Sequence, residues 1–507
     1  MAVLSVLLGL LGSYLLGWII YARWFHPYSK YPGPFLASIS PLWVIKELWM
    51  GKIDISQRKW HEKYGPIIRI APNEVVISDP SVIKAIYGAG TTFTKTEFYK
   101  AFGTTWARYP EHFCNIDPKT HGERRKLISH VYTMSNVARY EPAIEECIDL
   151  LAQRVKDASE SGQSTDMALW LRYYAFDVIG VLFFSRPFGF LEFKRDYKGW
   201  IRATDTLIFF MAASAYVPLW MRNLVLMSSI VIPGAVASVK AMDTMTEATL
   251  DAVNERQKAL EKSGGVMEKD DMLASFFRVM EKHGNLDYYG PLEIRGEIYT
   301  ALMAGSDTTA TAITSVLYHL MKNPRTYRKL RDEIDTAVAE GRISSSGRVK
   351  YVNSVKLPYF DACCKEGMRI HTSLGLSLPR YTPKDGVELL GRFFPGGVKV
   401  GCSMQVVQRD KGVFGEDADE FVPERWLGPN AANMQRHMLN FGGGPHMCLG
   451  MHISMMEIYK ALPELIRDYD LELADPSKEW SVNNIWFYQT KDVHTNVTKR
   501  KRPVWVG

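Results

Sequence analysis

Cysteine is scarce in this sequence, with six residues among 507. So few cysteines exclude a small scaffold held together by disulfides. A surplus of one charge is also lacking: 61 Lys and Arg against 55 Asp and Glu leave a formal charge of +6, too mild to indicate a nucleic-acid-binding surface. With 47% hydrophobic and 23% charged residues, the chain is neither disordered, collagenous nor a coiled coil. We therefore expect a globular protein without a nucleic-acid partner.

Several cofactor motifs are absent as well. The sequence has no G-x-x-x-x-G-K phosphate loop, no G-x-G-x-x-G behind a predicted strand, no H-E-x-x-H and no C-x-x-C. It therefore shows no recognisable site for nucleotide phosphates, nicotinamide, flavin or zinc. If the protein carries out redox chemistry, its electrons must come from another protein.

The first segment has no charged residue from Ala2 to Ala22, and eleven of its positions are Leu, Ile or Val. A helix of this length spans about 30 Å, the thickness of a hydrocarbon core. A cleaved signal peptide is the alternative, but it would have a basic start and a shorter apolar stretch. Arg23, His26 and Lys30 instead follow the segment, which predicts a single-pass anchor with the remainder of the chain in the cytosol.

Three regions follow from this pattern. Residues 2–22 are predicted to be a transmembrane signal anchor. Residues 23–35 form a proline-rich hinge, because Pro32 and Pro34 restrict their own backbone and that of the residues before them. Residues 36–507 show no internal repeat or low-complexity block, so we expect one large catalytic domain.

Within that domain the pattern predicts a mainly α fold with a small β region. Gly65–Ser78 reads as a hairpin, and the chain from about Pro80 to Pro324 is overwhelmingly helical. Pro291–Asn323 is a single uninterrupted helical pattern. Short strands are expected at 387–394 and 397–407, and a further helix after Cys448. A second apolar stretch, 207–220, fits a buried helix and a surface that dips into a membrane equally well.

The chemistry is expected at Cys448, within the sequence F-G-G-G-P-H-M-C-L-G that spans Phe441 to Gly450. Three glycines let the loop backbone approach a flat ligand closely. A thiol at the start of a helix, among loop N–H groups, is expected to have a lowered pKa and to be held as a thiolate. Such a sulfur suits an axial iron ligand, and Gly450 would let the next helix lie against a macrocycle. An inert buried cysteine is the usual alternative for a lone cysteine.

This loop resembles the haem-binding loop of the cytochrome P-450 superfamily. The anchor, the Pro-Gly-Pro hinge, the long central helix, Glu366-x-x-Arg369, Pro423-Glu-Arg-Trp426 and the cysteine loop occur in the order of that family. The stretch from Tyr31 through Phe102 is further similar to the fungal pisatin demethylase-like branch. The resemblance implies the cytochrome P-450 fold, with haem b whose axial thiolate comes from Cys448.

The resemblance also assigns supporting residues. It implies a buried pair of Glu366 and Arg369, completed by Arg425, which supports the cysteine loop, whereas Glu366 and Arg369 alone would be an ordinary surface ion pair. The implied ligands of the haem propionates are His446, His121 with Arg125, and Arg380. Two of these are histidines where the family usually has Arg and Trp, so propionate pairing is expected to depend partly on pH. A solvated helix face is the alternative for the Arg124-Arg125 pair. The residues expected around the haem are Phe441, Gly442, Gly450, Ala304, His121, Arg125, Arg380 and His446, with Cys448 on the iron.

On the central helix, Ala304-Gly-Ser-Asp-Thr-Thr309 includes residues that loosen a helical ladder. Ala304, Thr308 and Thr311 share one face, which the resemblance places over the iron. Thr308 is expected to donate a hydrogen bond there and Asp307 to relay protons. Small residues that ease helix packing are the alternative explanation.

These features together predict a monooxygenase of the endoplasmic reticulum membrane that acts on an apolar small molecule. The implied electron donor is NADPH-cytochrome P-450 reductase, with cytochrome b5 as an optional second donor. The fungal resemblance points to secondary-metabolite biosynthesis, with detoxification of a host defence compound as the alternative. A haem-thiolate isomerase or dehydratase and a non-catalytic haem protein are the other classes considered. The expected pocket walls are Phe98 to Phe113, 207–220, Leu374 to Leu378, and Trp486-Phe487.

Overall fold

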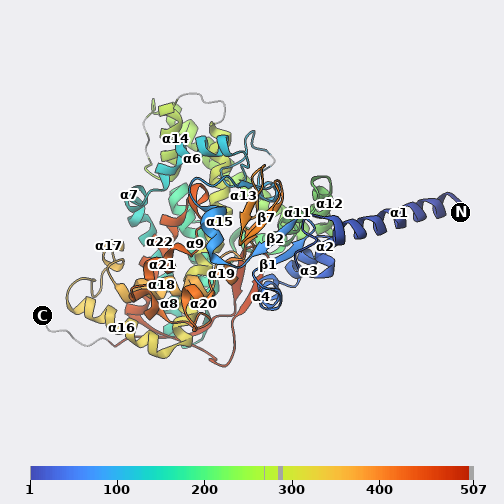
Figure 1. Cartoon of the computed structure of the whole chain (residues 1–507). Helices are drawn as coiled ribbons and strands as arrows, with labels where there is room; N and C mark the ends of the chain where they lie inside the picture. The colour runs from blue at the N-terminus through green and yellow to red at the C-terminus, as the bar shows by residue number, and fades with distance from the viewer. Residues whose placement is uncertain (1, 105, 266, 268, 284–288, 502–507) are drawn as a thin grey trace.

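The structure is a computed structural model that describes residues 2–104, 106–265, 267, 269–283 and 289–501. Helices make up 62% of it and strands 10%, so the prediction of a mainly α fold with a small β region is confirmed. Figure 1 shows a helical body, with the strands β1 (Ile67–Ala71), β2 (Glu74–Ile77) and β7 (Arg392–Phe394) on the side nearest the N-terminus, and the first helix projecting alone from the body.

The longer helices form most of the body. They are α1 (Ala2–Ile20), α3 (Leu42–Trp49), α4 (Ile53–Tyr64), α6 (Pro118–Ile128), α8 (Glu141–Ser161), α9 (Met167–Phe184), α11 (Trp200–Tyr216), α13 (Ala235–Lys262), α14 (Met272–His283), α15 (Pro291–Lys322), α16 (Pro324–Ala339), α18 (Pro358–Ile370) and α22 (Met451–Asp468). Shorter helices lie between them: α2 (Phe35–Ile39), α5 (Ile83–Tyr87), α7 (Met134–Val137), α10 (Phe190–Phe193), α12 (Arg222–Met227), α17 (Tyr351–Ser354), α19 (Met404–Val407), α20 (Lys411–Phe414) and α21 (Ala431–Arg436).

The strands make four small sheets. They are β1 (Ile67–Ala71), β2 (Glu74–Ile77), β3 (Thr94–Lys95), β4 (Thr165–Asp166), β5 (Arg380–Tyr381), β6 (Val387–Leu389), β7 (Arg392–Phe394), β8 (Lys399–Cys402), β9 (Tyr469–Leu473), β10 (Ser481–Asn484), β11 (Tyr488–Lys491) and β12 (His494–Lys499). The largest sheet has the order β1-β2-β8-β5-β3, in which β2 and β8 are parallel and the other neighbours antiparallel. The others are β4-β12-β9, β10-β11 and β6-β7. The predicted hairpin at 65–78 is β1-β2.

The long central helix was predicted almost to the residue, as α15. Pro291 occupies its first turn, where a missing N–H costs nothing, and the Glu293 carboxylate accepts the N–H of Gly290 at 3.0 Å. The helix packs against α9, α18 and α22, and most of its side chains beyond Ser306 are buried. It therefore forms the axis around which the domain is built.

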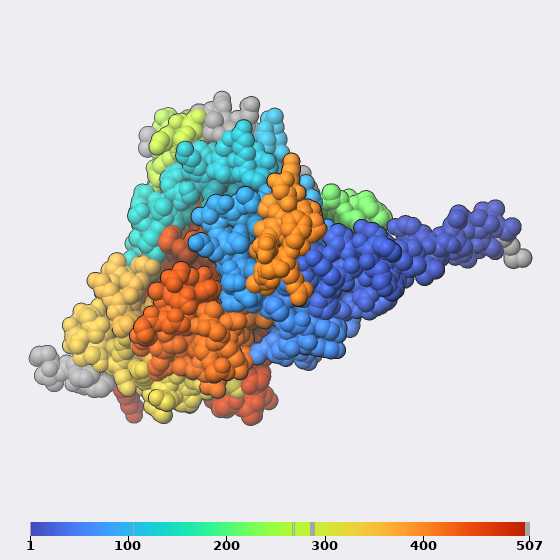
Figure 2. All heavy atoms as spheres, viewed as in Figure 1, coloured from blue at the N-terminus to red at the C-terminus, as the bar shows by residue number. Residues whose placement is uncertain are grey.

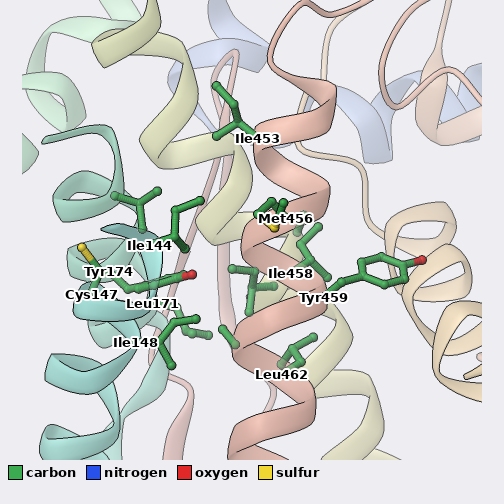
Figure 3. Close-up of a cluster of buried hydrophobic side chains, with 14 of the residues drawn as sticks. Ile144, Cys147, Ile148, Leu171, Tyr174, Ile453, Met456, Ile458, Tyr459 and Leu462 are labelled. Carbon is green, nitrogen blue, oxygen red and sulfur yellow. The ribbon is translucent and has the colours of Figure 1, made fainter. Parts of the chain in front are cut away.

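A second buried layer fixes the helix that follows Cys448. Figure 3 shows Ile144, Cys147 and Ile148 of α8 facing the α22 side chains Ile453 and Met456, with Leu171 and Tyr174 of α9 nearby. α9 is apolar on all sides and almost wholly buried, as expected of a helix inside a large core. Because α22 starts at Met451, this packing also fixes the position of the preceding loop.

Three predicted elements differ from the structure. The segment 387–394 was expected to be one strand, but a turn at Leu390-Gly391 divides it into the antiparallel pair β6 and β7. The segment 397–407 was expected to be one strand, but β8 ends at Cys402 and Met404–Val407 form α19, because Met404 and Val407 are buried at helical spacing. The stretch 207–220 is also divided. Its first part lies in α11 with Ile208 and Phe210 buried, whereas Leu219 and Trp220 are 56% and 74% exposed. The exposed apolar surface therefore begins near residue 219, not 207.

The N-terminal helix is long and apolar enough to cross a membrane. The most apolar 18-residue window of Ala2–Phe25 has a mean hydropathy of 2.2, and 0% of it is buried against the body. Met167–Phe184 is also long and apolar enough to cross a membrane, but 89% of this segment is buried inside the protein. α9 is therefore a core helix, and the N-terminal helix is the candidate anchor.

Candidate functional site

The cysteine loop has a tightly determined backbone. The Cys448 N–H donates to the Phe441 carbonyl at 2.7 Å, which closes the loop. Gly442 and Gly444 have φ values of +69° and +53°, a region that favours glycine. A Cβ on Gly444 would also lie 2.5 Å from the Tyr87 carbonyl oxygen. Glycine is thus required here both for the turn and for the close approach to α5.

Cys448 faces a cavity that brings together almost all of the predicted site residues. The predicted residues that line it are His121, Arg125, Ala304, Thr308, Arg380, Phe441, Gly442, His446, Cys448 and Gly450. All six cysteines of the chain are described, and only Cys448 lines this cavity. Asp307 is the one predicted haem-binding or catalytic residue that does not.

The protonation state expected for Cys448 is not what the protein alone produces. Burial raises the pKa of the Cys448 thiol above its ordinary value, although the N–H groups of Gly450 and Met451 and the Arg125 guanidinium act in the opposite direction. The expectation of a lowered pKa is therefore wrong for the chain by itself, because the loss of solvent outweighs the helix N-terminus. A coordinating metal ion would supply the missing stabilisation of the thiolate.

Two predicted cations, Arg125 and Arg380, line this cavity. The Arg125 Nη2 donates to the Met447 carbonyl at 2.6 Å, within the cysteine loop. Arg380 is 2% exposed, and its Nε has no partner among the described residues. A buried, unpaired guanidinium N–H needs an acceptor. These residues therefore fit a cofactor that carries carboxylates, as haem does.

The two predicted histidines lie side by side at the cavity. Burial, together with Lys95 and other cations, lowers the pKa of His121 to about 3 and that of His446 to about 2. Their rings lie 4.4 Å apart, and the His446 Nδ1 has no partner among the described residues. Both are neutral near pH 7 in the chain alone. In the chain alone the charge of the corner therefore comes from Arg and Lys, and the pH dependence expected of propionate pairing stays a prediction.

The predicted Glu366, Arg369 and Arg425 meet in the interior. Glu366 accepts both Nε and Nη2 of Arg369 at 2.8 Å, and Nε of Arg425 at 3.0 Å. Trp426 Nε1 donates to the same carboxylate at 2.8 Å, and neither Glu366 nor Arg369 is exposed. All four lone-pair directions of the carboxylate are thus in use, as a buried charge requires.

This charge cluster is connected to the cysteine loop through Gln408. Arg369 Nη1 donates to the Gln408 carbonyl at 2.9 Å. The Gln408 side chain accepts the N–H of Leu439 at 2.8 Å, two residues before the loop begins. Asn440 Nδ2 adds a bond to the carbonyl of Met368 at 2.7 Å. The backbone that leads to Cys448 is therefore fixed on α18.

The cavity side of α15 is lined by Ala304, Thr308 and Thr309. Thr308 Oγ1 donates to the Ala304 carbonyl at 2.7 Å, and Thr309 Oγ1 donates to Ser454 Oγ of α22 at 3.2 Å. Thr311 was expected on the same face, but its hydroxyl donates to the Tyr488 carbonyl at 2.9 Å. The prediction for Thr311 is wrong because β11 covers that turn of the helix.

Asp307 points away from the cavity into a buried ion pair. Its carboxylate accepts Arg172 Nε at 2.6 Å and Nη2 at 3.0 Å. Arg172 also bonds Asp205 at 2.7 Å, and Lys491 approaches Asp205 at 2.9 Å. The network connects α15 with α9, α11 and β11. Sequence reasoning missed Arg172, although a lone Arg inside an apolar helix is a signal for a buried acidic partner.

A second buried network was also missed. Glu297 of α15 accepts His112 Nδ1 at 2.5 Å and Arg124 Nη2 at 3.2 Å. Burial opposes its ionisation, but these two partners hold the pKa of the Glu297 carboxyl below its ordinary value. Arg124 is 2% exposed, so it is not part of a solvated helix face. The network ties the chain before α6 to α15, and His112 itself lines the cavity.

The remaining cavity wall is apolar and largely as predicted. It includes Phe102, Phe113, Ile208, Met211, Leu374, Leu378, Trp486 and Phe487. Phe102 stacks on Trp486 with ring centroids 4.9 Å apart. Phe98, in contrast, is fully buried behind these rings, and Thr105 of the predicted wall lies outside the described residues. The cavity thus has a cationic corner and an aromatic wall.

Comparison with known proteins matches these features. A family model described as Cytochrome P450 covers residues 32–492. The chain is 36% identical to the cytochrome P450 monooxygenase gsfF of Penicillium aethiopicum over 96% of this chain and 97% of that protein. It is 35% identical to cicH of Emericella nidulans, over 93% and 94% of the two chains. It is 32% identical to a pisatin demethylase of Fusarium vanettenii, over 96% and 92%.

We predict that Glu366→Gln destabilises the fold strongly, because it leaves the buried guanidinium of Arg369 without its counter-charge. Breaking such a pair costs about 3–5 kcal/mol of unfolding free energy. Urea unfolding followed by circular dichroism measures this loss. Glu416→Gln is the matched control, since the Glu416–Lys411 pair is exposed and its loss should cost about 0–1 kcal/mol. Equal unfolding midpoints for the two variants would contradict the structural role of Glu366.

Proposed function

This chain belongs to the cytochrome P450 family of haem-thiolate monooxygenases, and on that premise we propose how it works. Cys448 would hold the iron of haem b through its thiolate. One domain, residues 36–507, performs the catalysis behind a hinge at 23–35 and an anchor at 2–22. The substrate is an apolar small molecule that receives one atom of dioxygen, while the other leaves as water at the expense of two electrons from NADPH.

The observation that carries this proposal is one cavity lined by Cys448, by unpaired cationic donors and by an apolar wall. When bound there, haem with a thiolate ligand supplies the activation of dioxygen. Arg125, Arg380, His121 and His446 would hold its carboxylates. Phe441, Gly442, Gly450 and Ala304 would pack against the ring.

We assign the delivery of protons for the reaction to side chains of α15. The Thr308 hydroxyl lines the cavity and donates its one proton to the Ala304 carbonyl at 2.7 Å, so a hydrogen bond to a cavity ligand requires this proton to turn away from Ala304. Asp307, the next residue, is proposed to pass protons to this position. In the arrangement described above it is paired with Arg172, so its part in the relay requires that pairing to loosen.

The aromatic wall indicates the substrate. Phe102, Phe113, Trp486 and Phe487 present ring faces and edges, which suit a neutral, largely apolar molecule with flat parts. We assign the protein to fungal secondary-metabolite biosynthesis, by similarity to fungal monooxygenases. Detoxification of a plant defence compound is the second candidate, favoured by the similarity to pisatin demethylase.

The electron donor in this proposal is NADPH-cytochrome P-450 reductase, with cytochrome b5 as an optional second donor. The protein is placed in the endoplasmic reticulum membrane as a single-pass protein. Its catalytic domain faces the cytosol, because Arg23, His26 and Lys30 follow the anchor.

A second membrane contact is proposed beside the anchor. Leu224, Ile230 and Val231 are 59%, 61% and 82% exposed, and α12 adjoins α11, which packs on α3. α3 itself exposes Leu42 and Trp49. In Figures 1 and 2 this surface lies next to the base of α1. Apolar side chains gathered there would enter the same leaflet as the anchor.

Thr308→Ala tests the function and the site together. Product formation should require NADPH, the reductase and dioxygen, and the product should carry one atom from labelled ¹⁸O₂. The variant should still bind substrate and consume NADPH, but more of the reduced oxygen should escape as peroxide. The loss of one hydrogen bond, worth about 0.5–3 kcal/mol, changes this partitioning by about two- to over a hundred-fold.

The readout is the ratio of product to NADPH consumed, with extracts of a strain lacking the protein as the substrate source. Thr309→Val is the matched control, since the Thr309 hydroxyl is committed to Ser454. Unlabelled product would contradict monooxygenation. A ratio unchanged in Thr308→Ala would remove Thr308 from the mechanism.

Membrane attachment should have two separable parts. Deletion of residues 1–21 should weaken liposome binding and leave haem content near normal. Adding Leu224→Ser and Val231→Ser should weaken it at least tenfold further, because each buried apolar side chain is worth about 1.5–3 kcal/mol. Val352→Ser is the control: it is 60% exposed on α17, far from α1 (Figure 1). Liposome binding is measured by flotation. An equal loss of binding in all three serine variants would contradict the second membrane contact.

A further inference from the structure

A second cavity lies apart from the one that holds Cys448. Its volume is about 530 Å³, within the range of small-molecule sites, and the two cavities share no lining residue. They lie on either side of the last turn of α9, where Phe183 lines the cysteine cavity and Phe184 lines the second one. We call the second cavity the α9–α13 cleft, because most of its lining comes from residues 184–200, which follow α9, and from residues 248–260 of α13.

The chain from 184 to 200 supplies an aromatic wall to this cleft. The ring of Phe188 packs edge-on against Trp200, with centroids 4.9 Å apart, and against Phe184 at 5.1 Å. The indole N–H of Trp200 donates to Thr244 Oγ1 of α13 at 2.9 Å, which fixes the ring and joins the two parts of the lining. The wall therefore needs little rearrangement to accept a flat apolar group.

A buried ion pair holds the elements around the cleft in place. Arg256 of α13 donates to both oxygens of Asp271, at 2.9 and 2.6 Å, and the same carboxylate accepts the hydroxyl of Ser185, directly after α9. Ser185 and Lys198 have φ values of +53° and +60°, a region that residues with a side chain adopt only where the surrounding contacts require it. The cleft is thus preformed, and the charge of Arg256 is already offset.

The other charges of the cleft are separated by sign. Arg186 and Lys198 belong to the aromatic wall, are exposed, and have no side-chain hydrogen bond or ion pair with any described residue. Lys198 Nζ lies 5.8 Å from the centroids of two neighbouring rings, and Lys269 adds a further cation to the lining. Asp251 and Glu255 are four residues apart on one face of α13, and neither has an ion-pair partner in the described part of the chain. The cleft therefore presents free positive charge from one part of its lining and free negative charge from another.

We propose that the α9–α13 cleft binds an aromatic zwitterion, a flat molecule that carries one carboxylate and one ammonium group. Its ring packs against Phe188 and Trp200, its carboxylate meets the cations of the aromatic wall, and its ammonium meets the two carboxylates of α13. A purely anionic or purely cationic ligand would satisfy one set of charges and leave the other without a partner. This site goes beyond the proposed monooxygenation, because none of its residues lines the cysteine cavity.

Three indole compounds of similar shape separate the two charges of the ligand. Tryptophan carries both groups, indole-3-propionate has only the carboxylate, and tryptamine has only the ammonium. Each is titrated into the holoenzyme by isothermal titration calorimetry, with a bulky azole bound to the iron so that the cysteine cavity is filled. Tryptophan should bind about 3- to 30-fold more tightly than either analogue, because each analogue loses its contacts with two exposed charges.

Double variants assign each ligand group to its part of the lining. Arg186→Gln with Lys198→Gln should weaken the binding of tryptophan and indole-3-propionate by about 3- to 30-fold and should not weaken that of tryptamine. Asp251→Asn with Glu255→Gln should weaken the binding of tryptophan and tryptamine by a similar factor and should not weaken that of indole-3-propionate.

Matched controls come from exposed residues of α13 that lie outside the cleft. Lys258→Gln and Glu247→Gln should bind all three compounds like wild type, and circular dichroism confirms that each variant is folded. Equal affinity of wild type for the three compounds, or no binding of tryptophan, would mean that the cleft binds no zwitterion and would overturn the proposal. Tryptophan affinity that neither double variant lowers, or that the controls lower equally, would place the bound compound elsewhere on the protein and would overturn it as well.

Discussion

The buried carboxylate of Glu366 supports the irregular part of this fold. Two arginines and a tryptophan occupy its oxygens, and Arg369 passes the connection on to Gln408 and so to the backbone before the cysteine loop. The chain from 403 to 450 has only short helical turns of its own. The charge cluster before the loop and the packing of α22 after it together hold Cys448 at the cavity.

Burial of charge also explains the site as a whole. One corner of the cavity collects cations whose bonds go to neutral groups, and its other wall is aromatic. A cofactor with an apolar ring and two carboxylates satisfies both surfaces at once. For the same reason Asp307 is paired with Arg172, and Glu297 with His112 and Arg124. The negative charges of these two α15 residues are therefore offset by protein cations and are not available to the cations of the cavity.

Local patterns in the sequence predicted those features that depend on residues close together in the chain, such as helices and turns. The uninterrupted helical pattern predicted α15, and the glycines predicted a tight turn before Cys448. The spacing of Glu366 and Arg369 predicted that both lie on one helix face. The role of Arg172 could not be found in this way, because its partner Asp307 lies 135 residues away, on a helix whose packing against α9 the sequence does not state. The raised pKa of Cys448 was missed for a related reason: the helix N-terminus is visible in the sequence, whereas the extent of burial is not.

The central claim is that Cys448 is the thiolate ligand of the haem. The most direct test is the absorption spectrum of the reduced protein with carbon monoxide, whose red-shifted Soret band requires thiolate ligation. The account predicts that wild type shows this band, that Cys448→Ser or Cys448→His lacks it, and that Cys402→Ser, which alters a cysteine away from the cavity, keeps it. A band that survives in Cys448→Ser would contradict the account and assign the ligand to another cysteine.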